Sequence, residues 1–269
     1  MVLLTASHKQ RTDNEMGNGI TDSSTLCVVP LFDKICDSDK NKERFISFLN
    51  QKCGNKLPSV IDSPWQYIYY GKRTSTHMGE SRFRAPQSRL IWLVKYLFGK
   101  NCFIDKLKSC KNPVTIEKRK RLFSGDQSTK DEAIKALKAN CPEPWMIFEG
   151  GTAPDVCIKT DKYVLVIEGK QTEGKRTTTT KWGMQRDQLI RHMDAFLDDA
   201  IRPVFGLFIY DGRVSANYNF EEYLSGQAFE ESLIHRKDKK LLEKARNGFL
   251  GAVTWEELGR IFHVSVCNK

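Results

Sequence analysis

The stretch Ala153-Pro-Asp-Val-Cys-Ile-Lys-Thr-Asp-Lys-Tyr-Val-Leu-Val-Ile-Glu-Gly-Lys170 decides the fold that the sequence predicts. It is typical of two β-strands that are joined by a tight polar turn at Asp161-Lys162. A two-residue loop of this kind pairs Thr160 with Tyr163 across the hairpin. The register of the whole hairpin then follows by counting outward from that pair.

Counting outward places Asp155 directly opposite Glu168. Cross-strand partners have Cβ atoms about 4.5–5.5 Å apart on one face of the sheet. Because side chains alternate along a strand, Lys170 shares the face of Glu168 while Gly169 faces away. Two carboxylates and a lysine therefore converge, and a hard divalent cation is the natural partner for the two acids.

This inference depends on the loop length, because a loop of odd length would send the two acids to opposite faces. A four-residue loop preserves the pairing. The Glu-x-Lys triplet is weak by itself, and a second copy occurs at Glu173-Gly174-Lys175 in a stretch typical of a loop. The first copy ends the apolar run 163–167, which indicates a central strand buried on both faces. The alternative interpretation is a solvated strand end.

Pro154-Asp155 with Glu168-Gly169-Lys170 resembles the signature of the PD-(D/E)xK nuclease superfamily. The resemblance implies an α/β protein with a restriction-endonuclease-like core that runs helix, three-stranded meander, helix, strand. Around the motif, periodicity predicts a first helix over 128–140, a first strand over 145–148 and a second helix over 184–200. The run 204–210 is a convincing fourth strand.

These elements divide the chain into four parts. We expect a flexible segment over 1–25, a mainly helical region over 26–127 that is a candidate for substrate recognition, the nuclease core over 128–212, and a helical extension over 213–269 that packs on the core.

The resemblance also assigns roles to the converging residues. Asp155 and Glu168 would coordinate Mg²⁺, which Mn²⁺ can replace, and the backbone carbonyl of Gly169 would add a ligand. Lys170 would orient a water molecule, help to deprotonate it and neutralise developing charge. Asp155, Glu168 and Lys170 are therefore the candidate catalytic residues.

Many members of the superfamily have a third acid from the first helix, and Glu132 is the candidate here. Acids in the first turn of a helix are otherwise expected from the helix dipole alone. Glu149 is a weaker candidate, because it precedes a Gly-Gly turn and we expect it to be solvated.

Two groups of residues are candidates for nucleic-acid contacts. In the helix after the motif, Gln188 would support the site and Arg191 would bind a phosphate, although an ordinary polar helix flank explains both equally. Lys175, Arg176 and Lys181 follow the motif strand in a Thr-rich stretch, and the alternative for them is a surface loop. The histidines, His192 among them, show no metal-ligand spacing.

Composition agrees with a nucleic-acid partner. The chain has 43 lysines and arginines against 33 acids, a net charge of +10, and its pI is about 9.1. No apolar run reaches membrane-spanning length, and no Cys-x-x-Cys pair occurs among the eight cysteines. We therefore expect no membrane partner, reduced thiols and a cytoplasmic location.

The sequence thus predicts a Mg²⁺-dependent DNA nuclease, with a restriction-type endonuclease as the leading form and a homodimer as a candidate assembly. A repair, recombination or mobile-element nuclease is the first alternative. The second is a DNA-binding protein that keeps the fold without cleaving.

Overall fold

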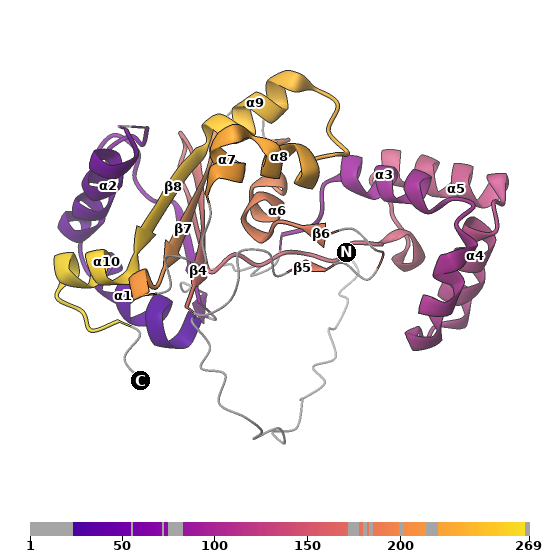
Figure 1. Ribbon diagram of the computed structural model, residues 1–269, viewed down its shortest axis with the longest axis horizontal. Helices are drawn as coiled ribbons and strands as arrows, with labels where there is room; N and C mark the ends of the chain where they lie inside the picture. The colour runs from indigo at the N-terminus through magenta and orange to yellow at the C-terminus, as the bar shows by residue number, and fades with distance from the viewer. Residues whose placement is uncertain are drawn as a thin grey trace, which may run out of the picture.

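The protein is described from a computed structural model that covers residues 24–54, 56–71, 73–74, 83–171, 178–179, 182, 185–198, 202–213 and 220–266. Its centre is a six-stranded sheet with the strand order β2-β1-β3-β4-β7-β8 (Figure 1). The strands are β1 Tyr67–Tyr70, β2 Arg73–Thr74, β3 Val156–Lys159, β4 Val164–Lys170, β7 Val204–Tyr210 and β8 Phe249–Thr254. Strands β1, β3 and β4 form an antiparallel meander, and β7 and β8 continue the sheet in parallel to β4. The fold is therefore α/β with a mixed sheet.

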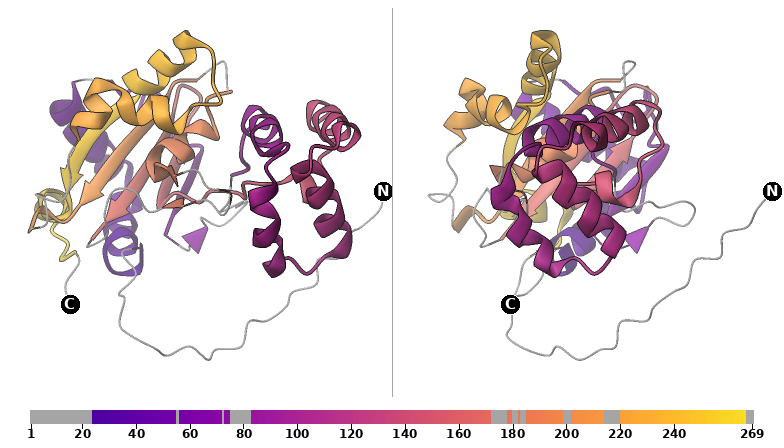
Figure 2. Two further views of the ribbon diagram at one scale, coloured as in Figure 1. Left: turned by 45° about the vertical axis from the view of Figure 1, so that its right-hand side comes forward. Right: turned by 90° about the vertical axis from the view of Figure 1, so that its right-hand side faces the viewer.

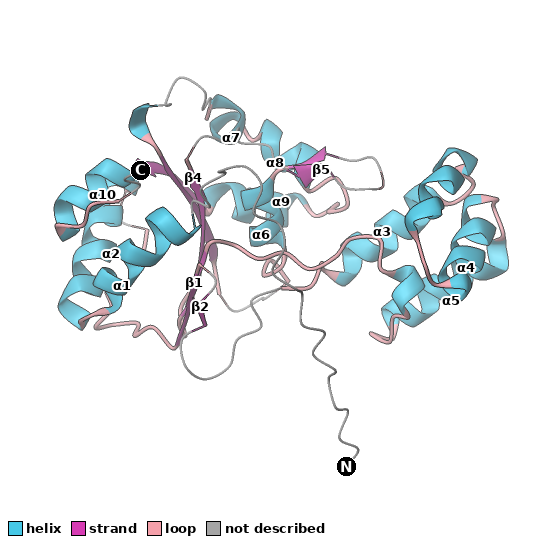
Figure 3. Cartoon of the chain, turned by 90° about the horizontal axis from the view of Figure 1, so that it is seen from below, coloured by secondary structure: helices cyan, strands magenta, loops and turns pink. Residues whose placement is uncertain are grey.

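Helices cover both faces of this sheet (Figures 1 and 3). One face packs against α1 Val29–Cys36, α2 Asp39–Cys53 and α10 Trp255–Phe262, with the π-helical turn η1 Ser24–Val28 before α1. The other face packs against α6 Gln188–Asp194, α7 Glu221–Ser225, α8 Gln227–Ser232 and α9 Lys239–Asn247. All seven residues of β4 are buried. The prediction of a central strand buried on both faces is confirmed.

A separate group of helices lies between β1 and β3 in the sequence, and we call residues 83–148 the helical lobe. It contains α3 Gln87–Leu97, the 3₁₀ helix η2 Asn101–Ser109, α4 Pro113–Phe123, α5 Gln127–Lys138 and the 3₁₀ turn η3 Pro144–Met146. Figure 2 shows the lobe standing to one side of the sheet. Its buried apolar side chains form a hydrophobic cluster of their own, which includes Leu93, Phe123 and Leu137.

The strand predicted over 145–148 does not form, because residues 144–146 are a 3₁₀ turn. The side chains of Trp145, Met146 and Phe148 all enter the hydrophobic cluster of the lobe instead of alternating between two faces. The first strand of the meander is β1, which precedes the lobe.

The predicted core boundaries, 128–212, do not enclose the whole sheet. The helix predicted over 128–140 forms as α5, but its buried residues pack inside the lobe and not on the sheet. Strand β1 lies in the region predicted to be mainly helical, and β8 lies in the predicted helical extension over 213–269. The sheet therefore draws on segments from both sides of the predicted core.

The helix predicted over 184–200 is shorter than expected. Residues Gln185–Arg186 form the short strand β6, which pairs with β5 Thr178–Thr179. Helix α6 begins at Gln188. Asp187 caps its N-terminus, because the Asp187 side chain accepts a hydrogen bond of 3.0 Å from the backbone N–H of Ile190.

Two further expectations concern location. None of the helices within the described ranges has the length and hydropathy that crossing a membrane requires. The expectation of reduced thiols is wrong for Cys27, which is disulfide-bonded. The cysteines at 36, 53, 102, 110, 141 and 157 are free.

Strand β8 starts from a close backbone contact. The backbone N–H of Gly206 donates a 3.0 Å hydrogen bond to the carbonyl of Gly248, and a Cβ atom at position 248 would collide with the carbonyl oxygen of Val204. We expect Gly248→Ala to lower the free energy of unfolding by about 1–3 kcal/mol, measured by urea denaturation. The control is Gly150→Ala, where an added Cβ meets nothing within 4 Å. Equal effects of the two substitutions would contradict this packing of β8 on β7.

Candidate active site

The turn of the β3–β4 hairpin has the predicted length. The backbone N–H of Thr160 donates to the carbonyl of Tyr163 at 3.0 Å, which leaves Asp161-Lys162 as a two-residue loop. The Thr160 hydroxyl accepts hydrogen bonds from the N–H groups of Lys162 at 3.1 Å and Tyr163 at 2.9 Å. These bonds stabilise a tight turn that contains no glycine.

The register that follows from this turn is the predicted one. The ladder pairs Val156 with Ile167, so the next positions outward are Asp155 and Glu168. Asp155 lies immediately before β3, and its carbonyl accepts a 2.8 Å hydrogen bond from the N–H of Gly71. The structure thus places Glu168 on β4 and Asp155 immediately before β3, at the same end of the hairpin.

Asp155 is bound to the backbone of the motif strand. Its Oδ2 accepts a 2.8 Å hydrogen bond from the N–H of Gly169. A Cβ atom at position 169 would lie 2.8 Å from the Trp255 ring and 3.3 Å from Asp155 Oδ2, so this close approach favours glycine. In a strand the N–H and C=O of one residue point to the same neighbour. The carbonyl of Gly169 therefore faces the side on which Asp155 lies.

Glu168 is buried, with 2% of its surface exposed, and both of its carboxylate oxygens are hydrogen-bonded. Lys170 Nζ donates to Oε1 at 2.8 Å, and His192 Nε2 lies 2.9 Å from Oε2. Burial alone would raise the pKa of Glu168, but the hydrogen bond with His192 and the charge of Lys170 outweigh it and lower the pKa below its usual value. Glu168 therefore carries a negative charge at neutral pH.

Lys170 is held at both ends. Its ammonium group also donates to Gln188 Oε1 at 3.0 Å, and its backbone carbonyl accepts a 3.0 Å hydrogen bond from the indole N–H of Trp255. Gln188 is the first residue of α6, so the helix start positions its amide beside the lysine. The predicted supporting residue thus lies in contact with a predicted catalytic residue.

His192 is the residue of this site that the sequence analysis missed. It lies one helical turn after Gln188 and is 1% exposed. Its Nδ1 lies 2.6 Å from the Thr152 hydroxyl, while Nε2 faces Glu168. Because an ionised carboxylate only accepts, Nε2 donates to Glu168, and in a neutral imidazole Nδ1 would then accept a hydrogen bond from the Thr152 hydroxyl. The i, i+4 spacing from Gln188 was the available signal, but an ordinary polar helix flank has the same spacing.

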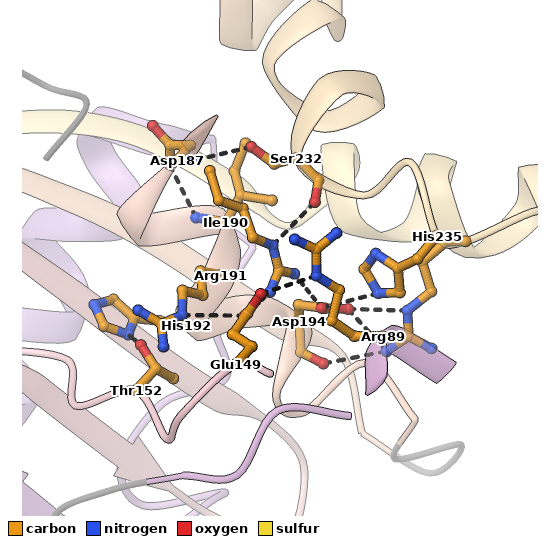
Figure 4. Close-up of polar contacts among 12 residues, drawn as sticks. Arg89, Glu149, Thr152, Asp187, Ile190, Arg191, His192, Asp194, Ser232 and His235 are labelled. Carbon is orange, nitrogen blue, oxygen red and sulfur yellow. Dashed lines mark hydrogen bonds and ion pairs between the residues drawn. The ribbon is translucent and has the colours of Figure 1, made fainter. Parts of the chain in front are cut away.

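A buried network of ion pairs lies next to this site (Figure 4). At its centre Glu149, which is 4% exposed, contacts Arg186, Arg89 at 2.9 Å and Arg191 at 3.2 Å. The expectation that Glu149 is solvated is therefore wrong. Burial alone would raise its pKa, but the three guanidinium groups outweigh it and lower the pKa. The Gly-Gly turn that suggested exposure instead supplies carbonyls to Arg191.

Arg191, the predicted phosphate contact, is one member of this network. Its Nε binds Glu149, and one amino group donates to the carbonyls of Gly150 at 2.8 Å and Gly151 at 3.3 Å. Arg191 lies on α6, and these contacts join that helix to the Gly150-Gly151 segment that leads to Thr152.

Asp194 is the second centre of the network. It is fully buried, and its carboxylate contacts Arg186, Arg236 at 2.8 Å and His235 at 3.0 Å (Figure 4). Burial alone would raise its pKa, but Arg186, His235 and Arg236 together lower it well below the usual value. Arg186 also donates to the carbonyl of Ser232 at 3.0 Å, so it joins Glu149, which follows the lobe, to α6 and α8.

Of the remaining candidates, the structure describes Glu132 and does not place it at the site. Glu132 lies on α5 in the helical lobe, where Lys118 Nζ binds both of its oxygens at 2.6 and 2.8 Å. The expectation of a third acid at Glu132 is wrong, because the apolar face of α5 packs into the lobe. Lys175, Arg176 and Lys181 lie outside the described residues.

The donor set fits a two-carboxylate magnesium site. No group of three or more His, Cys, Asp or Glu side chains that could hold a metal ion occurs among the residues that the structure describes. Mg²⁺ takes one or two protein carboxylates and completes its shell with waters and phosphate oxygens. A carboxylate has about four lone-pair sites, so Glu168 keeps capacity beside its two hydrogen bonds. Asp155, Glu168 and the Gly169 carbonyl are therefore sufficient.

The charge on Asp194 gives a pH-dependent prediction. Because folding lowers its pKa, the stabilisation is present above the usual value of 3.8 and is lost as the pH falls through the folded-state value. We expect Asp194→Asn to lower the free energy of unfolding at pH 7 by about 3–5 kcal/mol, since it leaves buried arginines uncompensated. Urea denaturation of both proteins from pH 7 to pH 3 measures the difference, which should shrink toward the acid end. A difference that is constant over this range would contradict the assignment.

Searches against known protein families, curated proteins and solved structures find no match to this chain. A function for the protein therefore has to be inferred from the residues and contacts of the site itself.

Proposed function

We propose that this protein is a Mg²⁺-dependent nuclease that hydrolyses phosphodiester bonds in DNA, in the form of a restriction-type endonuclease. The observation that carries the proposal is the register of the β3–β4 hairpin, which sets Asp155 opposite Glu168 at the end of a buried sheet. Lys170 lies on the face of Glu168 and binds it at 2.8 Å. Two acids and a lysine so arranged match the PD-(D/E)xK pattern that the sequence resembles.

The order of elements supports the same proposal. With β2 and the helical lobe treated as an insertion between β1 and β3, and the short β5–β6 pair as one between β4 and α6, the elements α2, β1, β3, β4, α6 and β7 follow in sequence. They run helix, antiparallel meander, helix and a strand parallel to the last meander strand. This is the order that a restriction-endonuclease-like core requires.

Each residue then has a role that its contacts allow. Asp155, Glu168 and the Gly169 carbonyl would hold the cation, which when bound polarises a phosphoryl oxygen and lowers the pKa of a water molecule. Lys170 would orient that water and balance developing charge, and its hydrogen bond to Gln188 fixes the ammonium group. His192, oriented by Thr152, would hold the Glu168 carboxylate in place.

One observation favours a second function, a DNA-binding protein that does not cleave. Both oxygens of Glu168 already have hydrogen-bond partners within the protein, so part of the acid's capacity is used internally. A repair, recombination or mobile-element nuclease would use the same site and would differ only in its substrate.

Cleavage of supercoiled plasmid and linear DNA separates these functions. We expect cutting by the wild type with Mg²⁺ and none with EDTA. Lys170→Ala should lower the rate by at least about a hundredfold, the usual contribution of a positioned proton-transfer group, while DNA binding in EDTA is retained. Discrete fragments would indicate sequence-specific restriction, and a smear would favour another class of nuclease.

The matched control is Asp39→Ala, which removes an exposed carboxylate of α2 that pairs with Lys42 outside the helical lobe. It should cut at the wild-type rate. Full activity of Lys170→Ala, or no cutting by folded wild type that binds DNA, would overturn the nuclease proposal.

A further inference from the structure

The positive charge of this chain is concentrated in the helical lobe. Residues 83–148 hold 14 lysines and arginines against 6 acids, so they carry +8 of the chain's net charge of +10. The sheet, its covering helices and the remaining segments together are close to neutral. A charge this uneven marks a surface for a polyanionic partner.

Most of this charge lies on the lobe surface. Only Arg89 and Arg119 are buried, and both are used internally, by Glu149 and by the carbonyls of Trp145 and Ile147. Six exposed side chains make no ion pair within the described residues, and we call them the lobe cations. They are Arg84, Lys95, Lys111, Lys120, Lys135 and Lys138.

The lobe is fixed beside the candidate active site. The N–H and C=O groups of Phe83, at the start of the lobe, exchange two 2.7 Å hydrogen bonds with Thr152. The same Thr152 orients His192, which binds Glu168. At the other attachment, Arg89 of α3 binds Glu149 in the buried network. The lobe therefore has a defined position relative to the site, as a substrate-binding arm requires.

We propose that the helical lobe is a DNA-binding arm, whose exposed cations bind phosphates of the duplex that flanks the scissile bond. The choice of DNA as the partner rests on the proposed function, in which DNA is the substrate of the neighbouring site. An anionic membrane fits less well. Membrane binding also needs an exposed apolar face, and Val114 is the one large apolar residue that the described part of the lobe exposes substantially.

The test compares two variants that lose the same charge from different surfaces. The lobe variant replaces Lys111, Lys120, Lys135 and Lys138 with alanine. The control variant replaces Lys40, Lys162, Lys239 and Lys240, which are exposed outside the lobe, with alanine. Binding to a fluorescent 30-base-pair duplex is measured in EDTA at salt concentrations from 50 to 300 mM, and thermal melting checks that both variants are folded.

We expect the lobe variant to bind at least about tenfold more weakly than the wild type near 150 mM salt. The slope of log K against log salt should fall by up to about 3.6, because each lost phosphate contact removes about 0.9. The control variant should keep a slope near that of the wild type. Three results would each overturn the proposal of a DNA-binding arm. They are equal slopes for the two variants, no DNA binding by the wild type, and tighter binding to phosphatidylserine vesicles than to the duplex.

Because EDTA suppresses metal-dependent cleavage, this test is independent of turnover. A wild type that never cuts, combined with a salt slope that depends on the lobe, would end the nuclease proposal and support the arm. If the wild type cuts DNA and the two variants have equal salt slopes, the nuclease proposal is supported and the DNA-binding arm is contradicted.

Discussion

The even-length turn between β3 and β4 is the constraint on which the rest of this structure depends. Thr160 closes the turn with its backbone and its hydroxyl, and the ladder that follows pairs Val156 with Ile167. One more residue in the loop would move every side chain of one strand to the other face. Asp155 and Glu168 would then separate, and the partners that α6 supplies to Glu168 and Lys170 would have nothing to bind.

The charge of the site is balanced by its surroundings. Lys170 and His192 hold Glu168, while the Asp155 carboxylate binds the backbone of Gly169. Behind them, four arginines share the buried acids Glu149 and Asp194, and their contacts join α3, α6 and the segment after α8. The helical lobe is thereby connected to the face of the sheet that carries Glu168 through paired charges, which are costly to break once buried.

Local patterns in the sequence predicted the centre of the fold well. The apolar run of β4, the polar turn and strand β7 formed as expected, because burial on both faces and turn chemistry are local properties. The sequence could not show that residues 71–155 separate the first two meander strands, so Trp145 to Phe148 looked like a strand. Glu132 was misplaced with it, since a helix does not reveal which core it packs against. His192 was missed because it contacts an acid far away in the sequence.

Metal binding tests the central claim most directly, because it needs neither a known DNA site nor turnover. Mn²⁺ binding to the folded protein is measured by calorimetry or electron paramagnetic resonance for the wild type, Asp155→Ala, Glu168→Ala and Glu132→Ala. If the hairpin register builds the site, Asp155→Ala and Glu168→Ala each weaken Mn²⁺ binding at least about tenfold, which is the lower end of the loss in affinity when a group at a metal site is removed. Glu132→Ala leaves Mn²⁺ binding unchanged. Binding that survives both Asp155→Ala and Glu168→Ala would contradict a metal site at the end of the β3–β4 hairpin.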